Sequence, residues 1–126
     1  INKLKEDESK LLILGDGNQT KPFMHVVDLL DAIDISMENV SGFDVFNVAG
    51  SGTTSVNNIA KIVCEEMNIK DVEFEYTGGK IGWKGDVPIY NFNTLKIRSL
   101  GWQNTLNSTE AVRLATKQNI GSTRNP

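Results

Sequence analysis

A short glycine loop that ends on a lysine is the part of the sequence best suited to chemistry. Residues 15–21 read Gly-Asp-Gly-Asn-Gln-Thr-Lys and lie between two apolar runs, residues 11–14 and 23–27. The Asp-Gly pair favours a sharp turn because glycine accepts a positive φ without a steric clash. A glycine loop that closes on a fixed cation, here Lys21 before Pro22, can receive a phosphate. The alternative is a plain hairpin loop with a solvated lysine.

The sequence around this loop resembles part of a known enzyme family. Residues 12–28 are similar to a segment of the extended short-chain dehydrogenase/reductases, the NAD-dependent nucleotide-sugar epimerases and dehydratases. Three further segments agree with the family in the same order: residues 46–52 (FNVAGSG), 85–88 (GDVP) and 100–102 (LGW). The resemblance covers residues 11–118 and matches the C-terminal, substrate-binding side of the family.

The resemblance implies a mixed α/β fold with about four helices and a few short strands, forming a single domain over residues 1–126. The family's Gly-rich dinucleotide fingerprint does not occur in its usual place, which implies a piece of a longer protein whose N-terminal Rossmann domain binds NAD. The intact protein would be an epimerase of a UDP-sugar, such as those acting on UDP-glucose. A dehydratase or reductase of the same family is the alternative. The piece alone would be inactive and bind no cofactor, and whether the intact protein is a homodimer stays open.

The resemblance also implies how the first segment would contact a nucleotide sugar. Leu12 and Leu14, just before the glycine loop, would face the base, although both leucines could instead belong only to the core. Lys21 stands where the family has arginine and would bind the diphosphate. Lysine is a flexible point charge and lacks the bidentate grip of arginine, which implies weaker binding or a second cation that shares the role.

A second group of expected contacts lies near the Gly-Asp pair of residues 85–86. The family has an arginine just before this pair, where the present chain has Trp83 followed by Lys84. We assign the diphosphate to Lys84, stacking on the ligand to Trp83, the ribose hydroxyls to Asp86 and a place near the sugar to Tyr90. For each of these residues, a turn residue or a core aromatic is the alternative.

Two other motifs look functional by spelling. Tyr76 and Lys80 match the Tyr-x-x-x-Lys spacing of the family's catalytic pair, but the glycines between them disfavour the helix on which that pair depends. Residues 50–55 nearly match Gly-x-Gly-x-x-Gly between an expected strand and helix, but Ser55 replaces the third glycine. A stand-alone nucleotide-binding module using residues 50–55 is therefore the alternative function, and we expect no catalytic residue in this chain.

Composition favours a soluble cytoplasmic domain without nucleic-acid or membrane partners. Charged residues make up 23% and hydrophobic residues 39% of the 126 residues, and the net charge is −3, so no basic surface favours nucleic acid. No apolar run reaches the length of a membrane span. His25, the only histidine, is expected to be a hydrogen-bonded core or hinge residue, and Cys64 a small apolar helix residue, so no metal site is expected.

Hydrophobic spacing predicts the elements that must position these residues. Residues 27–40 are predicted to form an amphipathic helix, whose apolar face is formed by Val26, Leu29, Leu30, Ile33, Met37 and Val40. Strands are predicted over residues 43–48 and 72–76. Further helices are predicted to begin at Ser55, at Asn93 and at Asn107 or Ser108, the last with Glu110 in a capping box. Residues 119–126 are predicted to form a frayed tail.

Overall fold

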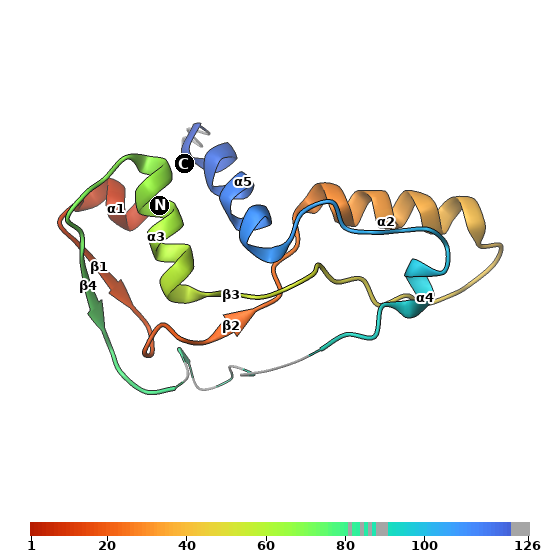
Figure 1. Ribbon diagram of the computed structural model, residues 1–126, viewed down its shortest axis with the longest axis horizontal. Coiled ribbons are helices and arrows are strands. Elements are labelled where there is room, and N and C mark those ends of the chain that lie inside the picture. Colours follow the sequence, from red (N-terminus) through yellow and green to blue (C-terminus); the bar gives the residue numbers. More distant parts are fainter. Residues whose placement is uncertain (81, 84, 86, 88–90, 122–126) are drawn as a thin grey trace.

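The computed structural model describes residues 1–80, 82–83, 85, 87 and 91–121. It confirms the predicted mixed α/β class (Figure 1). In chain order the elements are α1 (Asn2–Glu6), β1 (Lys10–Ile13), β2 (Thr20–Lys21), α2 (Val26–Asn39), β3 (Thr54–Ser55), α3 (Val56–Met67), β4 (Glu73–Tyr76), α4 (Leu95–Arg98) and α5 (Ser108–Gly121). None of these helices is long and apolar enough to cross a bilayer.

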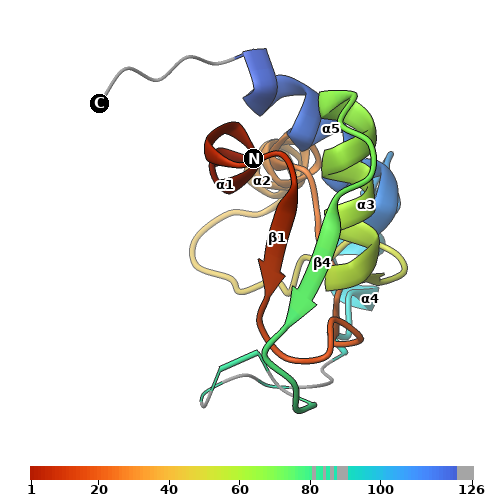
Figure 2. The ribbon, with the colours of Figure 1, turned by 90° about the vertical axis from the view of Figure 1, so that its left-hand side faces the viewer.

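Two short sheets hold segments that lie far apart in the sequence. β1 and β4 pair in parallel, from Lys10 opposite Glu73 to Ile13 opposite Tyr76, and they run side by side in Figure 2. β2 and β3 pair antiparallel, with Lys21 opposite Thr54. The parallel pair needs a crossover connection, and α3 supplies part of it just before β4. The glycine loop lies between β1 and β2, and both sheets therefore position it.

The first hydrophobic cluster joins α1, α3 and the β1–β4 sheet. Its buried members are Leu4, Val63 and Cys64, and the partly buried side chains of Leu11 and Phe74 pack on them from the two strands. The alternation of Phe74 with exposed glutamates gives β4 the one wet face that its sequence predicts. This cluster holds β1 in place on the side from which the glycine loop begins.

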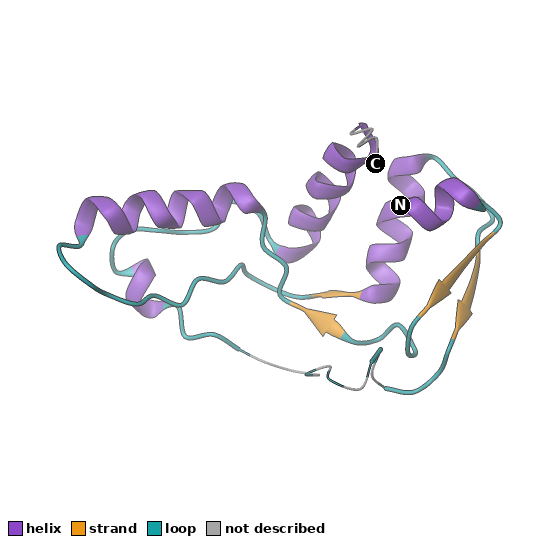
Figure 3. Ribbon diagram, turned by 180° about the vertical axis from the view of Figure 1, so that it is seen from behind, coloured by secondary structure: helices purple, strands orange, loops and turns teal. Residues whose placement is uncertain are grey.

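The second cluster lies at the opposite end of the molecule, where α2 and α4 are found (Figure 3). Ala32, Ile97 and Trp102 are its buried members. Trp102 is fully buried, and its indole N–H donates to the backbone carbonyl of Asp28 at 3.0 Å. Because the two clusters share no residue, the described part of the chain has two small cores rather than one.

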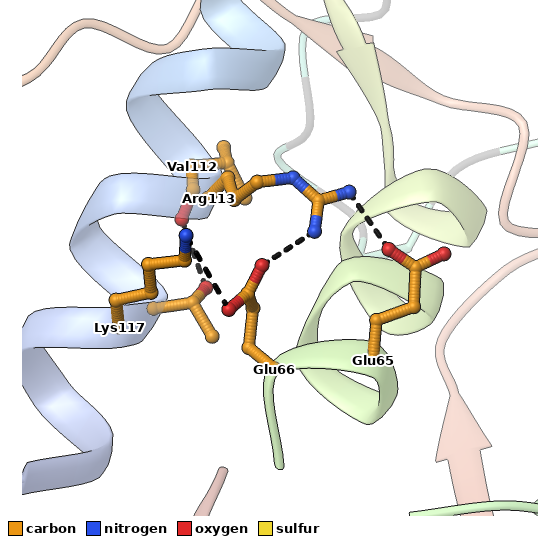
Figure 4. A network of polar contacts seen from close by, with 6 residues as sticks. Glu65, Glu66, Val112, Arg113 and Lys117 are labelled. Atoms are coloured by element: carbon orange, nitrogen blue, oxygen red, sulfur yellow. Dashed lines mark hydrogen bonds and ion pairs between the residues drawn. The ribbon is translucent and has the colours of Figure 1, made fainter. Parts of the chain in front are cut away.

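An ion-pair network joins α3 to α5 (Figure 4). The Arg113 guanidinium donates to Glu66 at 2.5 Å and to Glu65 at 2.7 Å, and Lys117 Nζ lies 3.8 Å from Glu66. These hydrogen bonds raise the pKa of the Arg113 guanidinium. The network lies where α3 and α5 pack, and α5 in turn reaches the strand that carries Lys21.

Two of the three predicted helix starts are confirmed by their capping contacts. Ser55 Oγ accepts from Asn58 N–H at 3.1 Å. The third helix, α4, begins one residue later than predicted: its N-cap is Thr94, and Asn93 Oδ1 accepts from Leu95 N–H at 3.0 Å in the turn before it. At the start of α5, Asn107 Oδ1 accepts from Glu110 N–H at 3.1 Å, while a Glu110 carboxylate oxygen accepts from Asn107 N–H at 2.8 Å. This reciprocal pair is the predicted capping box, with asparagine as its first member.

The orientation of α2 and the strand after it depart from the predictions. Most of the predicted apolar face is exposed. Its exposed side chains are Val26, Leu29, Leu30, Ile33 and Met37. The buried side of α2 instead carries Asp28 and Ala32. The strand predicted over residues 43–48 is wrong for this structure: the segment has no regular secondary structure and pairs with no described strand, and a strand forms only where its backbone groups find a partner.

The predicted frayed tail is partly wrong as well. α5 continues to Gly121, so residues 119–121 are helical. Asn119 Nδ2 donates to the Ala115 carbonyl at 2.7 Å, within the helix. Residues 122–126 lie outside the described residues.

Candidate functional site

A cavity of about 430 Å³ brings together four of the seven residues that the sequence singled out. Leu12, Leu14, Lys21 and Trp83 all line it, and Gln19 is a fifth lining residue. Among the described residues that line it, Gln19 and Lys21 have strongly polar side chains. The others are aliphatic, apart from Trp83 and Gly82. A largely apolar cavity of this size with few polar groups is typical of small-molecule sites.

Leu12 and Leu14 take the positions expected of surface contacts rather than of core residues. Their side chains are 45% and 52% exposed, whereas Ile13 between them is buried. This alternation follows from β1, in which successive side chains point to opposite sides of the strand. The alternative that both leucines are only core residues is therefore wrong, and both are available to a ligand in the cavity.

The glycine loop is fixed by contacts to α3 and to the end of β4. Gly15 and Gly17 adopt φ angles of 81° and 74°, the left-handed region predicted for them. Gly17 carbonyl accepts from Asn57 N–H at 2.9 Å, and Gly15 N–H donates to Thr77 Oγ1 at 2.8 Å. The backbone N–H of Gly15 is already used in a hydrogen bond within the protein. Binding of a phosphate at this loop would therefore depend on Lys21 more than on the loop backbone.

Lys21 is held at the cavity by its backbone. Ser108 Oγ, at the buried start of α5, donates to the Lys21 carbonyl at 3.2 Å and accepts from Phe23 N–H at 3.0 Å. The Lys21 Nζ donates to the backbone carbonyl of Val87. The lysine is thus anchored at its base, and its ammonium group reaches the segment that was expected to contribute the second set of ligand contacts.

The segment around Trp83 lies against the first segment, as the resemblance implies. An ideal Cβ on Gly82 would lie 3.0 Å from Gln19 Nε2 and 3.4 Å from the Leu14 carbonyl oxygen, so the backbones approach closely. Trp83 is 66% exposed at the cavity, where a ring can stack on a ligand. The other three expected site residues, Lys84, Asp86 and Tyr90, lie outside the described residues.

Gln19 is the residue that sequence reasoning missed. Its Nε2 donates to the Leu14 carbonyl at 2.7 Å, which closes the loop across residues 15–18. Its carbonyl Oε1 is buried without a hydrogen-bond partner among the described residues. A polar residue placed two positions before the expected phosphate cation was the only sequence feature that could have drawn attention to it.

The two motifs that match catalytic spellings do not form catalytic geometry. Tyr76 ends strand β4, and Gly78 and Gly79 follow it with positive φ, so Tyr76 and Lys80 share no helix. The Tyr76 hydroxyl donates to Asn57 Oδ1 at 2.9 Å. In residues 50–55, Thr54 and Ser55 form β3, which pairs with β2 beside the cavity. That pairing gives the segment a structural role next to Lys21.

The lone histidine and cysteine have structural surroundings. His25 is buried, with Nε2 3.0 Å from Gln118 Oε1 and Nδ1 accepting from Val27 N–H at the start of α2, as expected of a hydrogen-bonded hinge histidine. Cys64 is buried in α3, and burial raises the pKa of its thiol, which disfavours the reactive thiolate. A second groove of about 390 Å³ lies beside Cys64 and is lined by none of the expected site residues.

Comparisons with known proteins show which enzyme family the chain is similar to. The model of the NAD dependent epimerase/dehydratase family matches residues 1–49. The chain is 31% identical to a putative GDP-L-fucose synthase 2 of Arabidopsis thaliana over 74% of its length, and 28% identical to a putative UDP-glucose 4-epimerase of Methanocaldococcus jannaschii over 90%.

A crystal structure of a UDP-galactose 4-epimerase superposes on 94% of the chain with a TM-score of 0.75 and 26% identity. The chain spans only 27%, 35% and 38% of these three proteins, respectively. The shared motifs, the family match and the common fold lead to one assignment: the chain belongs to the NAD-dependent epimerase/dehydratase family.

Proposed function

We propose that this chain is the nucleotide-sugar-binding part of an NAD-dependent epimerase, with a UDP-sugar as the substrate. The observation that carries the proposal is the cavity lined by Leu12, Leu14, Lys21 and Trp83. Two segments about 60 residues apart in the sequence converge there, and both were expected to contact the same ligand. The alternative is a dehydratase or reductase that acts on a nucleotide sugar and uses the same cavity. Either enzyme would act in the cytoplasm.

The chemistry of the cavity suits the two halves of a nucleoside diphosphate. The exposed faces of Leu12 and Leu14 offer an apolar surface to a base, and Trp83 offers a ring for stacking. Lys21 supplies positive charge to the diphosphate through a side chain whose base is fixed by Ser108. The sugar would extend from this point toward the reacting groups.

The reaction itself would require residues outside this chain. A separate dinucleotide-binding domain would hold NAD, whose chemistry is the reversible removal of a hydride from the sugar carbon that bears the hydroxyl. The present residues would bind and orient the substrate. The relatives are roughly three times as long as the chain, which leaves room for such a domain.

The exposed apolar face of α2 offers a surface for that domain. Leu30, Ile33 and Met37 on α2 and Phe43 after it are exposed, with Phe43 92% exposed. A surface helix normally turns such a face inward, and a contiguous exposed apolar patch marks an interaction site. Residues 43–48 beside it lack a strand partner among the described residues. We therefore assign this surface to the dinucleotide-binding domain, which would supply the missing strand and cover the helix.

The two tryptophans provide a direct test of the proposed binding site. In ¹H–¹⁵N spectra of the 126-residue chain, UDP should shift the indole resonance of Trp83 and leave that of buried Trp102 in place, because only Trp83 lines the cavity. Titration to about 1 mM UDP suffices for a contact worth roughly 4 kcal/mol. Unchanged resonances of Trp83, Leu14 and Lys21 at saturating UDP would refute the proposal, as would shifts confined to residues 50–53.

A further inference from the structure

Gln19 contains the buried side-chain acceptor that has no hydrogen-bond partner in the described part of the chain. The orientation of its amide is determined by the other end, because Nε2 donates to the Leu14 carbonyl at 2.7 Å. A carbonyl can only accept, so the amide cannot turn over without placing two acceptors against each other. Oε1 is thus committed as an acceptor, and Gln19 is one of the residues that line the cavity.

An unsatisfied buried acceptor destabilises a protein unless something supplies the missing donor. The hydrogen bond from Gln19 to Leu14 has a structural role, but it uses only Nε2 and leaves Oε1 without a donor among the described residues. Gln19 lies between Leu14 and Lys21 in the sequence and lines the same cavity as these two residues, on the side expected to lie beside a base. The donor that would satisfy it is therefore most simply a group on the ligand.

We infer that Gln19 Oε1 accepts a hydrogen bond from the ring N–H of the nucleobase and so selects bases that carry this N–H beside a carbonyl. Uracil, thymine and guanine have such a lactam edge, whereas cytosine and adenine present a ring lone pair at the same place. This inference rests on the proposed function, because it requires the base to lie in the cavity. Gly82 lies close to the Nε2 end of the same amide.

Selection arises because the wrong base leaves the acceptor unsatisfied. Opposite the ring lone pair of cytosine, Oε1 stays buried without a donor and also faces a second acceptor. Sites built around a hydrogen bond reject ligands that lack the matching group more strongly than apolar pockets reject small differences in shape. We expect UDP to bind about tenfold more tightly than CDP, which corresponds to one hydrogen bond.

The test compares UDP and CDP binding to the chain and to Gln19→Met by calorimetry. Methionine keeps the length of the side chain and removes the acceptor. The variant should bind UDP about tenfold more weakly and CDP unchanged, so that the preference disappears. Gln103→Met, at an exposed glutamine away from the cavity, is the matched control and should keep the preference.

The outcomes separate this inference from the proposed function. Equal affinity of the unmodified chain for UDP and CDP would overturn the role of Gln19 while leaving a nucleotide site intact, and this holds even if Gln19→Met does not fold. A folded Gln19→Met that retains the preference would overturn it too, and would leave Gln19 as a loop clamp only. Absence of binding by either nucleotide would overturn the proposed function and the inference together.

Discussion

The indole N–H of Trp102 donates to the backbone carbonyl of Asp28 at 3.0 Å, which joins the core of the α4 region to the first turn of α2. The same aspartate holds the chain after Trp102 through its side chain: Oδ1 accepts from Thr105 N–H at 2.9 Å and from its hydroxyl at 2.6 Å. Oδ2 accepts from Leu106 N–H at 3.4 Å. Asp28 is thus a structural residue. The segment that it holds, Thr105 and Leu106, lies just before α5, whose start anchors Lys21.

We expect Asp28→Asn to destabilise the chain by about 2 kcal/mol at neutral pH, because it weakens charge-assisted hydrogen bonds in a buried network. Equilibrium urea unfolding would measure the loss. Asp31→Asn, on an exposed position of the same helix, is the matched control and should have little effect.

The stability difference between the two forms should depend on pH. Burial raises the pKa of the Asp28 carboxyl, but the hydrogen bonds from Thr105 and Leu106 outweigh burial, so the pKa lies below its usual value. A carboxyl whose pKa is lowered by folding stabilises the folded chain at pH values above its pKa in the unfolded chain, about 3.9. This stabilisation is lost as the pH falls through the pKa of the folded chain. The gap between wild type and Asp28→Asn should therefore narrow in acid, and a gap that stays constant down to about pH 2 would contradict this role.

Lys21→Met should weaken UDP binding by about 1.5–3 kcal/mol, or roughly ten- to a hundredfold, because it removes a charge-assisted contact to the diphosphate. Methionine preserves the apolar stem that lines the cavity. Uridine lacks the diphosphate and should bind both forms equally. Lys70→Met, at an exposed lysine beside the other groove, should leave UDP binding unchanged. A parallel loss of uridine binding would mean that Lys21 positions the loop and does not contact the phosphate.

Glu66→Gln should lower the melting temperature more than Glu65→Gln. Glu66 is 15% exposed at its side chain and faces both Arg113 and Lys117, whereas Glu65 is 60% exposed and pairs with Arg113 alone (Figure 4). Exposed ion pairs contribute little and are screened by salt. Differential scanning calorimetry at low and high salt would measure both, and equal effects of the two substitutions would contradict the special position of Glu66.

Leu30→Glu should leave the unfolding of the 126-residue chain nearly unchanged, because Leu30 is already half exposed on α2. The same substitution in a longer protein that includes a dinucleotide-binding domain should lower the melting temperature, because it buries a charge in the proposed interface. Ala32→Glu, on the buried side of α2, should destabilise both forms and is the positive control. If Leu30→Glu instead converts a dimer of the chain into monomers, the occupant of this surface is a second copy.

Local rules in the sequence were sufficient for much of the fold. Ser55 and the Asn107–Glu110 pair marked helix starts, and Asn93 marked one to within a residue, because capping depends on residues close together in the chain. Strand β4 was predictable from the alternation around Phe74. The glycines of residues 15–17 marked the loop, because positive φ angles are a local steric property.

The same local rules could not decide which side of α2 is buried or whether residues 43–48 pair. The helical period identified the apolar face of α2, but the contacts of Asp28 and Ala32 with distant segments turned the opposite side inward. A strand likewise needs a partner, and its own residues do not specify one.

For the candidate site, the sequence by itself determined which residue types were available: an apolar strand, a glycine loop and the cation Lys21. Only the tertiary structure decided that Trp83 lies beside them and that Gln19 Oε1 is buried without a partner. These facts depend on the parallel pairing of β1 with β4, which brings segments about 60 residues apart to one cavity. Burial and hydrogen-bond satisfaction are properties of such long-range packing, and no local pattern of residues encodes them.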